Sequence, residues 1–179
     1  LVPIPELRRH GVIEHGDDDT LLAEYAAAAV NEIEEATARC FLNKTYDLTL
    51  DCWPADWIEL PLAPVASVTS ITYVDGNGDA QTLDAGAYVV DTAREPARIV
   101  PAWGQSWPAV RSQPGAVMVR FVAGYGVTPD ASPAKARQAV RLYVGEAYEA
   151  RELGFETSLF RRTRAAEAWR DLLTSLRWK

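Results

Sequence analysis

The sequence predicts an α+β protein in which helices from the N- and C-terminal parts of the chain form a helical bundle that carries an inserted antiparallel β domain. Two segments, one near residue 20 and one after residue 132, carry apolar residues at helical spacing. Between them lie short segments rich in β-branched residues and separated by Gly and Pro. A chain of 179 residues is long enough to bury one sizeable core, or a core and a small satellite.

The first helix is predicted from about residue 19 to residue 40. Its apolar residues recur at intervals of three and four and therefore share one face: Leu21, Leu22, Tyr25, Ala29, Ile33, Ala36 and Cys40. Three aspartates, Asp17 to Asp19, precede this stripe and suit the positive end of the helix dipole. Residues 1–16 contain Pro3, Pro5 and Gly11, and we expect an irregular lead-in with a short turn there.

The middle of the chain is predicted to consist of short strands. Residues 45–53 alternate between apolar and polar side chains, which is the period of a half-buried strand. The β-branched segment 68–75 is followed by Asp75-Gly-Asn-Gly-Asp79, whose composition is typical of a hairpin turn. Further strands are predicted at 58–60, 81–83, 88–91, 98–100 and 117–122. Together they predict an antiparallel sheet or a small sandwich.

Two further helices are predicted near the C-terminus. Ser132 and Pro133 are typical of a helix start, and apolar residues continue at helical spacing to about Glu152. Residues 161–176 form an amphipathic pattern with arginines on its outer face. We therefore predict a helical core from residues 1–43 and 127–153, an inserted β domain from residues 44–126, and a C-terminal arm from residues 154–179.

The charge of the chain is unevenly distributed. The formal net charge is −7, but residues 151–179 carry 7 basic and 4 acidic residues, whereas residues 1–150 carry 11 basic and 21 acidic ones. An acidic body disfavours nucleic acid binding, whereas the basic tail either meets an acidic partner or forms a solvated helix face. No leader and no apolar run of about 20 residues is present, so we expect a soluble protein made in the cytoplasm.

The sequence gives little support for a catalytic, metal-binding or cofactor-binding motif. His10 and His15 are five residues apart, which matches no helical metal pair, and we expect a structural or exposed role for both. The Asp75 segment begins like a calcium loop but lacks the later Gly and Glu. Residues 104–108 lack the second Gly of a nucleophile elbow, and no phosphate-binding Gly loop is present. We predict no catalytic residue, no metal and no cofactor, and hence no enzyme.

The two cysteines and six tryptophans give further expectations. Cys40 and Cys52 are too few for a disulfide framework, and we expect buried thiols in a cytosolic protein. Tryptophan both fills cores and anchors interfaces. We expect Trp53 and Trp103 in the core, and Trp169 and Trp178 at a contact.

The order of these motifs resembles the phage head-tail connector (adaptor) proteins, in the branch with a β insertion. That branch is found in long-tailed phages, prophages and gene transfer agents. The similarity covers about residues 17–153, and the motifs that carry it are residues 21–29, 33–39, 60–75, 88–91, 97–101, 107–108, 121–126 and 148–152. Ala38 stands where a Gly is usual before the Arg of the first helix.

The resemblance implies a structural subunit of the virion neck, at the head-tail junction. Such subunits form a ring, commonly of twelve copies, beneath the portal and connect it to the stopper or tail. The implied partners are the portal protein, stopper or tail proteins and further copies of the chain, with DNA passing transiently and non-specifically through the lumen. Synthesis and assembly are expected in the bacterial cytoplasm. An acidic wall that repels phosphate suits such a conduit.

The resemblance also implies a role for the C-terminal segment, which family members often use to grip the portal. The candidate portal-binding arm on this chain consists of Arg161, Arg162, Arg164, Trp169, Leu172, Leu173, Leu176 and Trp178. We expect a protein that lacks residues 155–179 to fold without assembling on the portal. The alternatives are another neck or tail protein (a stopper or tail terminator), a carbohydrate-binding module that uses Trp107, and a lytic accessory enzyme, against which the shortage of His argues.

Overall fold

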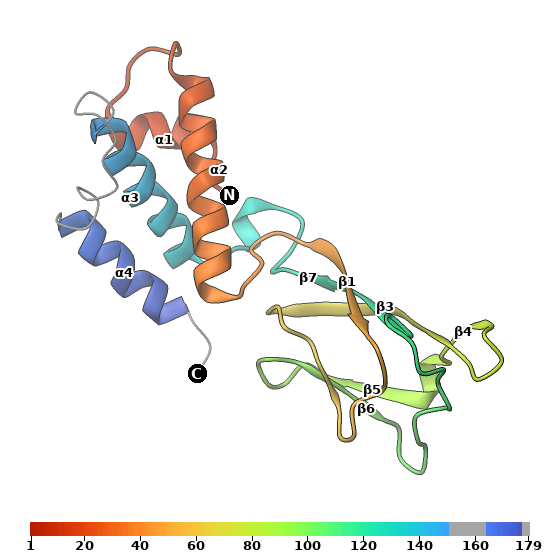
Figure 1. The fold of residues 1–179 in the computed structure, drawn as a ribbon. Coiled ribbons are helices and arrows are strands. Elements are labelled where there is room, and N and C mark those ends of the chain that lie inside the picture. The colour runs from red at the N-terminus through yellow and green to blue at the C-terminus, as the bar shows by residue number, and fades with distance from the viewer. Residues whose placement is uncertain (151–163, 177–179) are drawn as a thin grey trace. The chain divides into compact units, whose positions relative to one another are not determined.

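The computed structural model describes residues 1–150 and 164–176, and the chain forms two compact units (Figure 1). The helical unit comprises Leu1–Leu42 and Gly126–Trp178, and the β unit comprises Asn43–Tyr125. All the paired strands are antiparallel. The predicted α+β class, with helices from both parts of the chain and an antiparallel β domain between them, is confirmed.

The chain begins with a helix, α1 (Ile4–Gly11), where the sequence predicted an irregular lead-in. Pro5 lies in the first turn of α1, where a backbone N–H has no partner inside the helix, so this proline starts the helix instead of breaking it. Leu7 is the buried residue of α1, at 2% exposure. The helix ends at Val12, whose backbone is left-handed with φ 54°.

The second helix, α2 (Asp19–Thr37), ends three residues before the predicted boundary because the backbone of Ala38 is left-handed, with φ 53° and ψ 33°. The amides of Ala38 and Arg39 both donate to the carbonyl of Glu34, which closes the last turn. The Glu34 carboxylate then accepts the amide of Phe41 at 2.9 Å. A left-handed residue at this point explains why a Gly suits the position that Ala38 occupies here.

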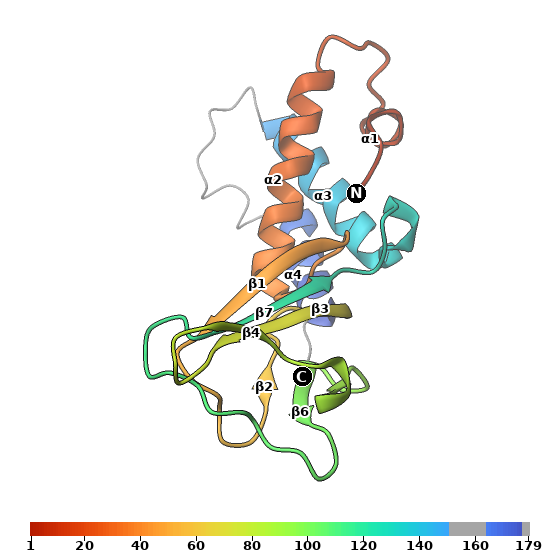
Figure 2. The same ribbon diagram turned by 90° about the vertical axis from the view of Figure 1, so that its right-hand side faces the viewer.

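Two C-terminal helices complete the helical unit: α3 (Ala134–Ala150), preceded by the short helix η2 (Pro129–Ala131), and α4 (Arg164–Leu176). Helices α2 and α3 run antiparallel, α4 packs on α3 and α2, and α1 crosses one end of the pair (Figures 1 and 2). Their shared core consists mainly of Leu22, Ala29, Ile33, Ala136, Ala139, Val140, Val144 and Ala147. The hydroxyl of Ser132 donates to the carbonyl of Phe41 at 3.0 Å and ties the start of α3 to the end of α2.

The β unit contains seven strands in two sheets, and each predicted strand is present. The four-stranded sheet has the order β1 (Lys44–Leu50), β7 (Val117–Ala123), β3 (Val65–Val74), β4 (Ala80–Thr82). The three-stranded sheet has the order β2 (Ile58–Glu59), β6 (Arg98–Pro101), β5 (Tyr88–Asp91), and a short helix, η1 (Ala85–Ala87), precedes β5. The two sheets form the layers of a small sandwich (Figure 2).

The core of the β unit depends on the pairing of its first and last strands. Strands β1 and β7 are in register from Lys44 opposite Ala123 to Leu50 opposite Val117. Alternate residues of β7 are buried, as expected for a strand with one face on the core. They contribute to a core with strands of both sheets: Ile58, Ile71, Ile99, Val117, Val119, Phe121 and Ala123.

The left-handed backbone of Ala38 generates a stability prediction. Replacing Ala38 by Gly removes the steric cost of a side chain at φ 53°, so we expect Ala38→Gly to stabilise the helical unit by about 0.5–1 kcal/mol. Ala27 is exposed in the interior of α2, and the same substitution there should cost about 1 kcal/mol. Urea unfolding followed by far-UV circular dichroism measures both. Equal destabilisation by the two variants would contradict the role of Ala38.

Candidate docking surfaces

The predicted portal-binding arm lies partly within the helical core. Leu173 and Leu176 of α4 are only 8% and 7% exposed, and the Trp169 ring lies 6.1 Å from the ring of Tyr143 on α3. Burial raises the pKa of Tyr143, and the negative charge of Glu32 adds to the effect. The Nε of Arg39 donates to the carbonyl of Leu176 at 2.5 Å and fastens the end of α4 to the segment after α2. The apolar stripe of α4 is therefore a packing face of its own unit.

The remaining arm residues divide into two groups. Leu172 is partly buried, while Arg170, Asp171, Thr174 and Ser175 are exposed on the outer face of α4. Arg164 is the first residue of α4, and Arg161, Arg162 and Trp178 lie outside the described residues. The face of α4 that a partner can reach is polar and charged. A helix docked in this way also argues against the expectation that the body folds unchanged without residues 155–179, because its removal would uncover apolar side chains.

The opposite end of the helical unit is held by charged and polar pairs. Arg8 of α1 forms a bidentate ion pair with Asp19, the first residue of α2. Arg141 of α3 pairs with Glu6 of α1, and the hydroxyl of Tyr148 donates to the Asp18 carboxylate at 2.6 Å. The hydrogen bond from Arg8 holds the pKa of Asp19 below its ordinary value. These contacts fix a helix too short to be stable alone.

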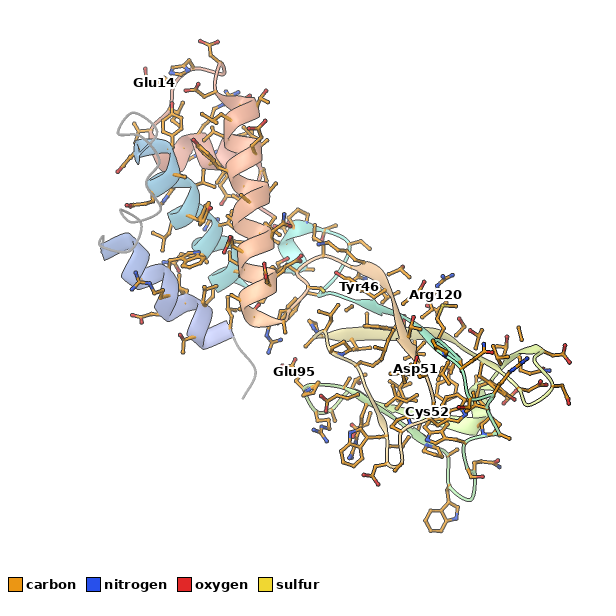
Figure 3. The ribbon with its side chains drawn as sticks, viewed as in Figure 1. Glu14, Tyr46, Asp51, Cys52, Glu95 and Arg120 are labelled. Atoms are coloured by element: carbon orange, nitrogen blue, oxygen red, sulfur yellow. The ribbon has the colours of Figure 1, made fainter. Side chains whose placement is uncertain are left out.

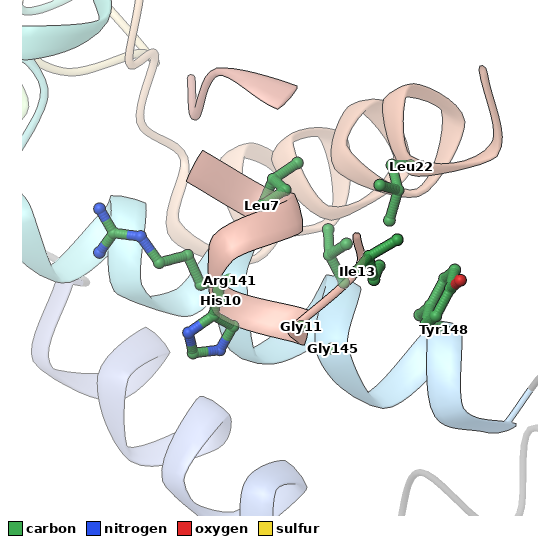
Figure 4. Close-up of a pocket in the computed structure, with 9 residues that line it drawn as sticks. Leu7, His10, Gly11, Ile13, Leu22, Arg141, Gly145 and Tyr148 are labelled. Atoms are coloured by element: carbon green, nitrogen blue, oxygen red, sulfur yellow. The ribbon is translucent and has the colours of Figure 1, made fainter. Parts of the chain in front are cut away.

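A small hollow lies where α1 meets α3 (Figure 4). It is lined by apolar side chains of Leu7, Ile13 and Leu22, with His10 beside Gly145. Its volume of about 10 Å³ is close to the least that one water molecule needs. The hollow is therefore too small for a substrate or cofactor. His10 lies at its edge, and both His10 and His15 are exposed. The Nδ1 of His15 lies 4.0 Å from the Asp17 carboxylate.

The exposed face of the four-stranded sheet is mostly uncharged. Asp47 of β1 and Arg120 of β7 stand opposite each other and form two hydrogen bonds of 2.8 Å. Arg120 is labelled in Figure 3. This pair lowers the pKa of Asp47 and neutralises the charge of both residues at the centre of the face. Its neighbours on the three longer strands are mainly hydroxyl-bearing residues: Thr45, Thr49, Ser67, Ser70 and Thr72.

Two of the tryptophans form an aromatic stack inside the β unit. The rings of Trp53 and Trp107 are parallel within 5° and 4.7 Å apart, and Tyr73 lies 5.7 Å from Trp53. Both indole N–H groups are buried without a hydrogen-bond partner among the described residues. Trp53 therefore packs as expected, and one face of the Trp107 ring is covered by the ring of Trp53, which disfavours a sugar platform on that face.

Trp57 and Trp103 are more exposed. Trp57 is 37% exposed, and its ring lies 5.9 Å from the guanidinium of Arg94 and 5.4 Å from that of Arg98. Trp103 has a relative exposure of 101%, so the expectation that it belongs to the core is wrong. Its hydrophobicity suggested burial, but it occupies a tight turn that directs the side chain into solvent. The candidate residues named from the sequence did not include it.

The other motifs fold into ordinary local structure. The Asp75 carboxylate accepts the amides of Asn77, Gly78 and Asp79 and the side chain of Gln81, so the calcium-like segment is a self-bonded turn. The described residues contain no group of three metal-ligating side chains. Cys40 is buried, but Cys52 is exposed (Figure 3), so the expectation of two buried thiols fails for Cys52.

No helix among the described residues is long and apolar enough to cross a membrane. No family model matches the sequence, and none of the curated proteins does. Solved structures do match. A chain in the neck of an empty gene transfer agent particle, computed with C6 symmetry, is 28% identical with a TM-score of 0.78, and the match covers 99% of this chain and 90% of that one.

Two further solved structures are also similar to this chain. A chain in the virion of a native gene transfer agent particle is 29% identical, with a TM-score of 0.77 and the same coverage of both chains. A chain in the neck of a native particle, computed with C12 symmetry, is 31% identical with a TM-score of 0.70 over 93% of this chain and 87% of that one. The similarity therefore includes both the helical unit and the β unit.

The ion pair between α1 and α2 generates a pH prediction. Since the pKa of Asp19 is lowered in the folded state, its contribution to stability is fully present above the ordinary value of 3.8 and is lost as the pH falls through the lowered value. We expect Asp19→Asn to lower the melting temperature at pH 7 and the two melting curves to converge in acid. Asp17→Asn is the control, because that side chain is 94% exposed. No difference between wild type and Asp19→Asn at pH 7 would contradict the prediction.

The packing of α4 generates a second prediction. Leu173→Ala should destabilise the helical unit by about 2 kcal/mol or more, because it leaves a cavity beside α3. Thr174→Ala, on the exposed face of the same turn, should change stability by less than about 0.5 kcal/mol. Urea unfolding compares them. Similar small effects for both variants would show that α4 is not a structural part of the unit.

Proposed function

Since this chain belongs to the same family as a neck protein of gene transfer agent particles, we propose that it is a structural adaptor subunit of a particle neck. In this proposal, copies of the chain form a ring beneath the portal and connect the portal to the stopper or tail. The observation that carries the proposal is the match over nearly the whole chain, with both units included. The neighbours come from necks computed with sixfold and twelvefold symmetry, which supports a ring of identical copies. We propose twelve copies.

In this proposal the C-terminal segment contacts the portal through its charged face. Trp169, Leu173 and Leu176 hold α4 on the helical unit, and the basic residues of the segment make the contact. Residues 151–179 carry an excess of three positive charges on an otherwise acidic chain, so they suit an acidic portal surface. In this proposal Arg161, Arg162, Arg164, Leu172 and Trp178 remain the portal-binding residues of the arm.

The remaining chain would form the body of the ring. Residues 1–150 carry ten more acidic than basic residues, which prevents tight binding of DNA phosphates and lets DNA pass. A conduit of this kind needs no catalytic group and no cofactor. The proposal therefore describes an assembly protein and not an enzyme.

The experiment that tests the function is assembly on purified portal rings of the same particle. We expect the wild-type protein to bind the portal and to appear as a ring beneath it by electron microscopy. The double variant Arg161→Glu/Arg162→Glu should weaken binding by about tenfold or more and make the residual binding less sensitive to salt. Arg9→Glu/Lys135→Glu changes the charge equally at two exposed positions of the helical unit and should have little effect.

Three outcomes decide the proposal. Binding of the wild type to portal, lost only in the arm variant, supports the adaptor role and the arm. If the arm variant still binds the portal, the proposed role of the arm is wrong, but the adaptor role of the chain stands. Binding to purified tail rings and not to the portal would identify a stopper or tail terminator instead.

A further inference from the structure

Trp103 stands at the tip of a well-defined turn in the β unit, residues 102–105, which we call the Trp103 turn. The amide of Gln105 donates to the carbonyl of Ala102 at 2.9 Å, and Gly104 has φ 75°. A hydrogen-bonded turn with positive φ at its third residue is a type II turn, and Gly is the residue this position favours. The turn therefore holds Trp103 outward in one backbone conformation.

The Trp103 turn is anchored on both sides. Before it, the amide of Ala102 donates to the carbonyl of Ala87 at 2.9 Å, next to β5. After it, Trp107 stacks on Trp53 at 4.7 Å. The exposure of Trp103 is thus a consequence of a fixed backbone. A backbone that is already ordered loses little conformational freedom when a partner covers the turn, which favours tight binding.

The segment around the turn is free of charge. Residues 99–110 contain no acidic or basic residue, in a chain of which 24% of residues are charged. Within this segment, residues 103–106 are all exposed. Tryptophan buries a large apolar area when covered and is enriched among residues that dominate binding energy. A fully exposed Trp on an uncharged, anchored turn has the properties of an interface anchor.

The charge of the chain indicates which partner covers it. Each copy has a net charge of −7, and the β unit alone has nine acidic and five basic residues between positions 43 and 125. The net charges of identical copies repel each other, which favours a contact between copies that is made by uncharged groups. A basic or acidic partner would instead favour a charged docking surface.

We propose that the Trp103 turn is the anchor by which one copy of the chain binds the next copy in a ring. The proposal rests on the ring-forming function proposed above and names the contact that forms the ring. In a cyclic ring the contact is heterologous, so the turn of each copy is covered by a different surface of its neighbour. The portal contact and the copy-to-copy contact then use different surfaces and different forces.

The first test is a substitution. Trp103→Ser should leave the melting temperature unchanged, because the side chain is fully exposed, but it should raise the protein concentration needed for ring formation on the portal by about tenfold or more. Val89→Ser is the matched control, since Val89 is 52% exposed on β5 of the same unit, and it should change this concentration by less than about threefold. Trp103→Phe should restore part of the assembly. Ring formation by Trp103→Ser at the wild-type concentration overturns the inference.

The second test identifies the partner. The photoreactive residue p-benzoylphenylalanine replaces Trp103, and the full-length protein is irradiated with and without portal rings. Crosslinks between copies, seen as a band at twice the monomer mass of 19.7 kDa, support the inference. Crosslinks exclusively to portal or tail proteins, or none at all, overturn it.

Salt separates this inference from the proposed function. Screening reduces the repulsion between like-charged copies, so crosslinks between copies should persist or increase from 0.1 to about 1 M salt, while an arginine-mediated portal contact weakens. Loss of the copy-to-copy crosslink at high salt overturns the inference. A wild-type protein that crosslinks between copies but never binds portal would overturn the adaptor role and leave the Trp103 contact standing.

Discussion

The hydrogen bond from the Ser132 hydroxyl to the carbonyl of Phe41 joins the two places where the chain leaves and re-enters the helical unit. Both residues are almost fully buried, at 3% and 0% exposure, so the bond is protected from water. The β unit closes its own ends in an equivalent way, because Lys44 at its start pairs with Ala123 near its end. The whole segment Asn43–Tyr125 can therefore be inserted without opening the helical core. Each unit keeps its own buried residues, and the surfaces left over are available for assembly.

Much of the fold follows from local patterns in the sequence. All seven strands were predictable from period-two alternation, β-branched residues and Gly or Pro between them, and α2, α3 and α4 from apolar spacing. Helix α1 was missed because Pro3, Pro5 and Gly11 resemble breakers, although a proline in a first turn is compatible with a helix. The strand order was not predictable, since the pairing of β1 with β7 joins residues that lie far apart in the sequence, from Leu50 opposite Val117 to Lys44 opposite Ala123.

The candidate site was harder to predict because hydrophobicity does not say which surface covers a side chain. The apolar stripe of α4 suits a portal as well as it suits α3, and the structure shows it packed on α3 and α2. Trp103 presents the opposite case, since its size suggested the core while the turn around Gly104 exposes it. Only the spatial neighbours of an apolar side chain show whether it packs in the core or is free to contact a partner. The local signal that could have indicated the exposure of Trp103 is the absence of charge around it, combined with a turn-forming Gly.

Ring closure is also a reason for the anchor to be rigid. In a twelvefold ring such as the one that gave the C12 structure, each copy is rotated by about 30° from the last, and an angular error at one contact is repeated at every other. A flexible loop would tolerate a range of angles and so permit open or wrongly sized assemblies. The Trp103 turn is fixed by a hydrogen bond on one side and by an aromatic stack on the other, so it limits that range. In our proposal the inserted β unit therefore sets the geometry of the ring, while the charged face of the helical unit selects the portal.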